Sequence, residues 1–246
     1  MKLSVIFPAY NEEKRIPKTL RLTYDYLKKQ DYQSEILVVN DGSKDKTGEV
    51  INGLKREIPI LRFIDNKENK GKGGVVKQGM LEAKGDYRLF SDSDNSTSID
   101  QVENIWPWLE KGFDIVIGSR DVKGAKLDPP QPFIRKVLFG DSFKLLRKII
   151  IGLWTIQDTQ CGFKCFSAKA AKDIFSEATE DGFIFDVEVL ILAKKLKYHI
   201  KEIPVSWKNS AESKVKLKNV FKMLFDMLKL RKDLILGKYV KIKKTN

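Results

Sequence analysis

The sequence predicts an α/β fold with a mostly parallel sheet flanked by helices. Short runs rich in β-branched and aromatic residues alternate with segments of helical apolar spacing through the first half of the chain. Strands joined in this way run parallel, and helices cover both faces of their sheet. With 246 residues and 42% hydrophobic content, the chain can bury one sizeable core.

Five strands are expected, at residues 3–7, 35–39, 61–64, 87–90 and 115–117. A helix is expected after the first strand, because Ile16, Leu20 and Leu27 recur at the spacing of one buried helix face. The apolar residues of 50–54 predict a second helix in the same way. Prolines at positions 129, 130 and 132 break the pattern and mark the end of this half.

Polar residues directly follow three of these strands. The carboxyl ends of parallel strands meet at one edge of the sheet, and ligands bind there in folds of this kind. Chemistry is therefore expected in three loops, which are Pro8-Ala9-Tyr10-Asn11-Glu12-Glu13, residues 40–47, and Ser91-Asp92-Ser93-Asp94-Asn95.

Asp92 and Asp94 bracket one residue at the end of a strand. Their carboxylates are placed to reach a single Mg²⁺ or Mn²⁺ whose other ligands are phosphate oxygens and water. Such an ion stabilises the charge that develops on a diphosphate leaving group. Acidic turns are common, so the pair alone is a weak signal, and its place at a strand end is what strengthens it.

Asp41 has two interpretations of equal weight. Its carboxylate either accepts hydrogen bonds from a nucleobase or ribose, or forms an Asx turn capping the helix that begins near Lys46. Residues 69–74 are rich in glycine and lysine, so their backbone is expected close to a diphosphate while Lys72 supplies positive charge. This segment matches neither the P-loop nor the Rossmann fingerprint, which disfavours a kinase or a dinucleotide-dependent dehydrogenase.

The composition disfavours other kinds of site. Cys161 and Cys165 have no histidine nearby, which supports neither a disulfide framework nor a zinc site. The single histidine, His199, lies between an expected helix and an expected strand and is interpreted as structural. The formal charge of +13 is concentrated at the end of the chain, where residues 208–246 hold twelve Lys or Arg against three Asp or Glu. An anionic partner is therefore expected.

Taken in order, these motifs resemble family 2 glycosyltransferases of the GT-A fold, which share the opening Pro-Ala-Tyr-Asn-Glu, the Asp-Gly-Ser run at 41–43 and the Asp-x-Asp at 92–94. Within that family the chain looks most like dolichyl-phosphate glucosyltransferases. That likeness is carried by residues 69–74, 90–94 and 118–120, and above all by Asp158-Thr159-Gln160-Cys161-Gly162-Phe163-Lys164. It continues through 185–188, 203–207 and 213–214, and so covers nearly the whole chain.

The resemblance implies a nucleotide-sugar donor, with UDP-glucose favoured. The residues implied at its nucleoside end are Pro8, Ala9, Tyr10, Glu12 and Asp41. Lys72 and metal-bound Asp94 are implied at the diphosphate, and Asp92 at the ribose or sugar and at the metal. Asp158 matches a family position near the sugar and metal, where it would orient the acceptor or take part in catalysis; its alternative is a turn carboxylate before a strand. The family often has Ala where Ser93 stands, which leaves metal binding intact but blurs the sugar preference.

The implied acceptor is dolichyl or another polyprenyl phosphate. A lipid phosphate is already ionised near neutral pH and needs no strong general base, which suits a chain with one histidine. Cations are expected to hold it, and the candidates are Arg120, Arg135 and Lys214, each otherwise a surface charge or a carboxylate partner. Arg120 is also a catalytic candidate beside Asp94 and Asp158. Attack opposite the leaving diphosphate inverts the anomeric centre, so an α-linked donor gives a β-linked lipid phosphate.

Residues 211–246 are expected to form a basic amphipathic tail after a glycosyltransferase domain at 1–210. One side of its helix carries an apolar stripe made of Leu217, Val220, Phe221, Leu224, Phe225 and Leu228. A second apolar stretch with basic residues, at about 131–154, is expected as an interfacial helical segment. Either segment is alternatively a helix packed on the core, but the tail's charge favours an anionic membrane face. With no signal peptide or spanning helix expected, the protein is predicted to be peripheral on the cytoplasmic face of a membrane.

Other functions stay open at this point. The nearest is synthesis of dolichyl-phosphate mannose from GDP-mannose, followed by another family 2 transferase acting on a lipid-linked or protein-linked glycan, and then by an inactive member that only binds lipid. From a different class, the basic tail suits a nucleic-acid-binding protein. No nucleic-acid partner is expected, because no such motif occurs and aromatic residues are not interleaved with the basic ones.

Overall fold

The structure is a computed structural model that describes residues 1–129, 142–208 and 217–239. Its main sheet is made of β1 Leu3–Ala9, β2 Ser34–Asp41, β3 Leu61–Asn66, β4 Tyr87–Ser91, β5 Ile115–Ser119, β7 Phe163–Ser167 and β8 Ile200–Pro204. A separate two-stranded sheet pairs β6 Lys126–Asp128 with β9 Ser206–Lys208. All five strands expected from the sequence are present, most of them a residue or two longer than predicted.

The helices are α1 Ile16–Leu27, α2 Thr47–Leu54, α3 Gly71–Glu82, α4 Trp106–Glu110, α6 Ser142–Ile151, α7 Ala168–Glu177, α8 Phe185–Lys195 and α9 Leu217–Ile235, with a 3-10 turn, η1, at Ile99–Asn104. The predicted spacing is confirmed in α1, which buries Ile16, Leu20 and Leu27. Helix α2 likewise buries Ile51 and Leu54.

The strands of the main sheet stand in the order β3-β2-β1-β4-β7-β5-β8. The neighbours β3-β2, β2-β1, β1-β4 and β5-β8 pair in parallel. Strand β7 lies between β4 and β5 and runs antiparallel to both. The prediction of a mostly parallel sheet is confirmed, and the antiparallel strand in its middle is a feature that hydrophobic spacing does not reveal.

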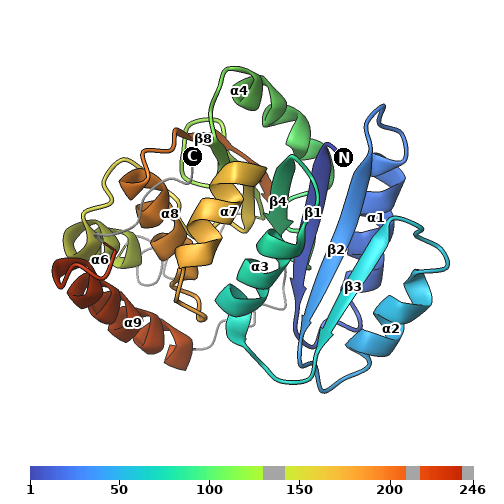
Figure 1. The fold of residues 1–246 in the computed structure, drawn as a ribbon, viewed down its shortest axis with the longest axis horizontal. Helices are drawn as coiled ribbons and strands as arrows, with labels where there is room; N and C mark the ends of the chain where they lie inside the picture. Colours follow the sequence, from blue (N-terminus) through green and yellow to red (C-terminus); the bar gives the residue numbers. More distant parts are fainter. Residues whose placement is uncertain (130–141, 209–216, 240–246) are drawn as a thin grey trace.

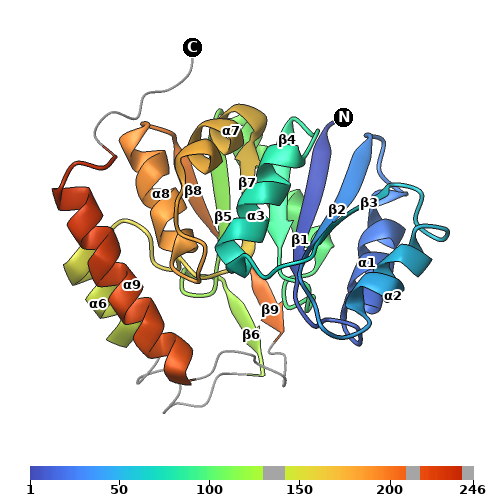
Figure 2. The same cartoon turned by 60° about the horizontal axis from the view of Figure 1, so that its bottom comes forward.

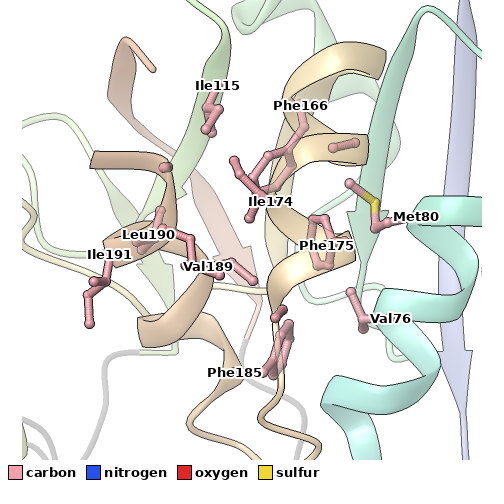
Figure 3. Packing of buried hydrophobic residues seen from close by; sticks show 14 of the residues in the cluster. Val76, Met80, Ile115, Phe166, Ile174, Phe175, Phe185, Val189, Leu190 and Ile191 are labelled. Carbon is pink, nitrogen blue, oxygen red and sulfur yellow. The ribbon is translucent and has the colours of Figure 1, made fainter. Parts of the chain in front are cut away.

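Apolar side chains are buried on both faces of this sheet. One cluster lies under α1, α2, η1 and α4, and the other lies under α3, α7 and α8, as the arrangement in Figure 1 shows. Figure 3 shows part of the second cluster, where Val76 and Met80 of α3 face Phe175 of α7 and Phe185 of α8. The sheet is therefore held rigidly between two layers, and its strand ends are fixed supports for the loops that follow them.

Helices α6 and α9 lie side by side at the end of the molecule farthest from β3 (Figures 1 and 2). Helix α9 buries Met227 and Leu230 in the second cluster, whereas Phe225 and Leu228 of the predicted stripe are 69% and 52% exposed. These two residues of the predicted stripe therefore do not pack on the protein. Leu224 packs partly against the cluster, and the side chains of Leu217, Val220 and Phe221 lie outside the described part. Among the described residues, no helix is long and apolar enough to span a bilayer.

Candidate functional site

The three loops singled out in the sequence meet at one edge of the sheet. Strands β2, β1 and β4 are parallel neighbours, so their carboxyl ends lie together. The backbone N–H of Glu12 donates to Thr47 Oγ1 at 2.7 Å, which joins the loops after β1 and β2. The hydroxyl of Ser93 donates to the carbonyl of Pro8 at 2.6 Å, which joins the loops after β4 and β1. The predicted convergence of these loops is confirmed.

Lys72 and Asp92 form an ion pair at this edge. The Nζ atom of Lys72, in the first turn of α3, lies 2.6 Å from Oδ1 of Asp92. Burial favours the neutral form of Lys72, but the charges of Asp92 and Asp186 outweigh it and raise the pKa of the amine. Asp94 accepts a hydrogen bond from the backbone N–H of Ser96 at 3.0 Å. The candidate residues Lys72, Asp92 and Asp94 thus lie at the same edge of the sheet and supply one ammonium and two carboxylates.

The two carboxylates of Asp92 and Asp94 suit a cation that is held partly by a substrate. Within the described ranges, no group of three or more His, Cys, Asp or Glu side chains is placed to hold a metal. Two carboxylates by themselves leave most positions of an octahedral shell to other ligands. Mg²⁺ and Mn²⁺ sites on nucleotides have this character, because phosphate oxygens and water complete the shell.

Asp41 ties the end of β2 to the loop before α3. Its Oδ1 accepts the backbone N–H of Lys70 at 2.6 Å, and its Oδ2 accepts the side-chain amide of Asn69 at 2.9 Å. Burial raises the pKa of this carboxyl, and these hydrogen bonds partly offset that effect. The helix-capping interpretation is wrong, because the Asp41 carboxylate is bonded to Asn69 and Lys70, and it is Asp45 that accepts the N–H of Thr47, the first residue of α2, at 3.0 Å.

The other residues implied at the nucleoside end differ in how accessible they are. Tyr10 is 38% exposed at the end of β1, whereas Ala9 is buried in the core and would meet a ligand only through its backbone. Glu12 is buried and receives two hydrogen bonds from Arg15, at 2.7 and 2.6 Å. Pro8 presents its carbonyl to Ser93.

Gly71 and Gly73 are approached closely by the backbone of another segment of the protein. A Cβ atom on Gly73 would lie 2.3 Å from the carbonyl oxygen of Glu180, and one on Gly71 would lie 2.4 Å from that of Asp181. The backbone N–H of Gly73 donates to the Asp181 carbonyl at 2.7 Å. The close approach expected for a diphosphate is thus made, at these two positions, by the loop before α8.

Arg120 and Asp158 are joined to each other. The guanidinium donates from Nε to Oδ2 at 2.7 Å and from Nη2 to Oδ1 at 2.9 Å, and the backbone N–H of Arg120 adds a third bond at 3.0 Å. Burial disfavours the charged form of each group, but the pairing outweighs it, lowering the pKa of Asp158 and raising that of Arg120. Arg120 also stands 5.5 Å from the ring centroid of Trp207. Asp158 is therefore a turn carboxylate before β7, and it is also the ion-pair partner of Arg120.

Arg135 and Lys214, the other two candidates for the acceptor phosphate, lie outside the described residues. The described chain stops shortly before each of them at the β6–β9 pair, where Asp128 lies beside Lys208. The backbone N–H of Lys208 donates to the carbonyl of Ser96 at 2.7 Å, which attaches this pair to the loop after Asp94.

Sequence reasoning missed a buried ion pair behind this loop. Lys164 of β7 is fully buried, and its Nζ lies 2.6 Å from Oδ1 of Asp186 in the first turn of α8. A usable signal was present, because Asp186 stands in the largely apolar run of residues 185–193, and a charge in such a helix is expected to have a partner. Position alone did not name Lys164 as that partner.

Comparison with known proteins supplies independent information. The sequence profile described as "Glycosyl transferase family 2" matches residues 4–175. The chain is 37% identical over 239 residues to dolichyl-phosphate beta-glucosyltransferase ALG5A of Trichomonas vaginalis, covering 93% of this chain and 72% of that protein. It is 36% identical to dolichyl-phosphate beta-glucosyltransferase of Saccharomyces cerevisiae, with 95% and 73% covered, and 34% identical to that of Homo sapiens, with 87% and 69% covered.

Solved structures share the fold at lower identity. Glucosyl-3-phosphoglycerate synthase of Mycobacterium tuberculosis, in complex with Mn²⁺, UDP and phosphoglyceric acid, superposes with a TM-score of 0.66 at 18% identity, covering 94% of this chain and 78% of that one. TarS of S. aureus in complex with UDP-GlcNAc gives a TM-score of 0.57 at 19% identity, covering 98% and 72%. The fold predicted from the sequence is confirmed.

Proposed function

Because this chain belongs to glycosyl transferase family 2, we propose that it transfers glucose from UDP-glucose to dolichyl or another polyprenyl phosphate. The observation that carries this proposal is the meeting of Lys72, Asp92 and Asp94 at the carboxyl edge of the sheet in a chain of this family. The curated relatives are named for transfer of glucose to dolichyl phosphate. The enzyme is a glycosyltransferase, and the donor, the metal and the acceptor are the proposed parts.

The donor diphosphate is proposed to lie against Lys72, Asp92 and Asp94. A bound Mg²⁺ or Mn²⁺ would supply positive charge where negative charge develops on the leaving diphosphate. Asp92 and Asp94 would hold that ion, and Lys72 would add a second positive charge from the start of α3. Homologous folds with Mn²⁺ and UDP bound support this use of the site.

The nucleoside is proposed to lie across the loops after β1 and β2. Asp41 and Glu12 are already bonded to the protein, so their first task is to hold these loops in shape. Tyr10 is exposed beside them and is suited to stack on a base. Recognition would then depend on loop shape and on a few polar groups placed by Asp41.

The acceptor phosphate is proposed to meet Arg120, with Arg135 and Lys214 as further cations. Asp158 holds the side chain of Arg120 in place, and guanidinium binds phosphate well because its donors form a planar fork. Asp158 then acts by orienting Arg120. The phosphate oxygen attacks from the side opposite the diphosphate, and the product is a β-linked glucosyl phosphate lipid.

Helices α6 and α9 are proposed to rest on a membrane surface, so that the lipid phosphate reaches the site from there. Their exposed apolar side chains are Leu145, Leu146 and Ile149 on α6 and Phe225, Leu228 and Ile235 on α9. Lysines and arginines such as Lys229 and Arg231 are exposed on α9. Exposed apolar groups combined with basic ones fit a peripheral helix on anionic lipid. The cytoplasmic face is the proposed location, since nucleotide sugars are expected there.

A transfer assay with several donors tests the proposal. The protein is incubated with radiolabelled UDP-glucose, UDP-galactose, UDP-N-acetylglucosamine or GDP-mannose, with Mg²⁺ or Mn²⁺, and with vesicles containing dolichyl phosphate. Label is expected in the lipid phase from UDP-glucose alone, and only with a divalent ion. Label from GDP-mannose would assign the mannose reaction instead, and no transfer by folded protein would contradict the polyprenyl-phosphate acceptor.

A further inference from the structure

The ion pair between Lys164 and Asp186 lies in an apolar part of the core. Lys164 is 0% exposed, and its Nζ donates to Asp186 at 2.6 Å and to the carbonyl of Cys161 at 2.5 Å. The ring of Phe90 lies 5.1 Å from that Nζ atom and 5.8 Å from the ring of Phe185. Removing two charges from water is costly, so a buried pair of this kind is weak grounds for a role in stability alone.

This pair reaches the donor site through Lys72. The start of α3 packs against the start of α8, where a Cβ atom on Gly73 would lie 2.7 Å from Cβ of Phe185. Asp186, the next residue after Phe185, therefore lies near Lys72 and acts on its charge as well as on that of Lys164, while Lys72 pairs with Asp92 at 2.6 Å. Carboxylates and ammonium groups therefore alternate in the order Asp92, Lys72, Asp186 and Lys164, which we term the charge row. If Asp92 turns towards a cation, Asp186 remains as a counter-charge that keeps Lys72 in place.

The pair also reaches Asp92 through the backbone. Lys164 holds the carbonyl of Cys161, and the next residue, Gly162, accepts the backbone N–H of Asp92 at 3.1 Å. A Cβ atom on Gly162 would come within 2.0 Å of the Asp92 carboxylate, so the turn and the aspartate are in direct contact. Lys164 thus supports the surface on which Asp92 rests.

We infer that Lys164 and Asp186 are positioning residues for the donor diphosphate. Asp186 keeps Lys72 in place by its charge, and Lys164 keeps Asp92 in place through the turn at Cys161 and Gly162. Lys72 and Asp92 are then positioned to receive the two phosphates. The inference rests on the proposed nucleotide-diphosphate donor. It predicts that the pair affects the affinity for the diphosphate and does not affect the affinity for the nucleoside.

The test removes both charges together. In Lys164→Met with Asp186→Leu no buried charge is left without a partner, so the double variant is expected to fold. Calorimetry then compares affinity for uridine with affinity for UDP plus Mn²⁺. UDP affinity is expected to fall about tenfold or more, as when a residue behind a metal ligand is lost, while uridine affinity stays within about twofold. Lys164→Gln with Asp186→Asn also leaves no buried charge and keeps two polar side chains that can hydrogen-bond to each other, and it carries the same expectation if the first double variant gives no folded protein.

A matched control separates positioning from general damage. Arg62→Met removes the cation beside Glu35, another buried carboxylate, near the β3 edge of the sheet. It is expected to lower stability while leaving the ratio of UDP to uridine affinity as in the wild type. A wild-type ratio in either folded double variant would overturn the inference. If the unaltered protein itself binds UDP no better than uridine, the UDP donor of the proposed function fails first, and the inference fails with it.

Discussion

Two regions of the molecule are held together by different kinds of contact. One is the donor half, which is β1–β4 with α1–α3, and the other is the layer formed by α6, α9 and Tyr239. In the donor half, neighbouring loops are bonded to one another across adjacent strand ends, as Glu12 is to Thr47. In the α6–α9 layer, single side chains reach buried carboxylates: Tyr239 donates to Glu188 at 2.7 Å, and Lys229 lies 3.1 Å from Glu180. Loops that are held to one another at the strand ends thus stand beside a layer that keeps apolar side chains such as Phe225 and Leu228 exposed.

The largest effect is expected outside both regions, at Asp158 in the turn before β7. The variant Asp158→Asn leaves Arg120 without its buried partner and should lower the free energy of unfolding by about 3 to 5 kcal/mol at pH 7. The pKa of Asp158 is lowered in the folded protein. The stabilisation is therefore complete above the unfolded pKa of about 4 and is lost as the pH falls through the folded value.

Denaturant unfolding at pH 7 and at decreasing pH measures this difference, which should shrink in acid. Asp25→Asn, which breaks an exposed pair with Lys28, is the control and should change the unfolding free energy little. A pH-independent difference would mean that the paired charges of Asp158 and Arg120 are not its cause.

In the donor half, Asp94→Asn should lower the transfer rate by about a hundredfold to a thousandfold, because a group that stabilises developing charge is lost. Its unfolding free energy should change little, since the one described hydrogen bond that Asp94 accepts comes from Ser96. Binding to vesicles should be unchanged, and co-sedimentation measures that. Loss of vesicle binding in Asp94→Asn would break the separation between the two regions.

In the α6–α9 layer, replacing Phe225 and Leu228 by serine should weaken binding to anionic vesicles about tenfold to a hundredfold, because two exposed apolar groups no longer enter the lipid. UDP binding in solution should stay as in the wild type. Leu22→Ser is the matched control, since Leu22 is 43% exposed on α1 in the donor half, and it should bind vesicles normally. Equal losses in the control would assign vesicle binding to general surface hydrophobicity.

The smallest effect is expected from Tyr239→Phe, which removes the hydrogen bond to Glu188 and the 3.2 Å contact with the hydroxyl of Thr179, and should cost about 1 to 2 kcal/mol. Hydrogen exchange measured by mass spectrometry should become faster in α9, while the strands of the donor half keep their protection. Faster exchange in β1 and β2 as well would show that the layer and the donor half open together.

The sequence predicted the donor half well because its signals are local. Strand runs and the polar residues that follow them are contiguous, and parallel pairing brings those loops together without further information. Asp41 shows the point at which prediction from local sequence signals ends. It was predicted just after a strand and is the last residue of β2, but its partners Asn69 and Lys70 come from a loop whose path the sequence does not specify.

The C-terminal layer was harder to predict because its contacts join distant residues. Helical spacing identified the apolar stripe of α9 but not which face packs, and Met227 and Leu230 are buried while Phe225 is exposed. The union of Arg120 with Asp158 likewise depends on how β5 and the turn before β7 meet. Two charged residues that each look suited to bind a ligand can form an ion pair with each other, and the sequence alone does not reveal that pairing.

The linkage of the product tests the central claim most directly. UDP-glucose and a short-chain polyprenyl phosphate are incubated with the protein, and nuclear magnetic resonance of the glycolipid determines the anomeric configuration and the atom to which glucose is bound. Attack by the lipid phosphate on the face opposite the diphosphate predicts glucose β-linked to a phosphate oxygen. An α-linked product, or glucose attached to any other group, would contradict the account.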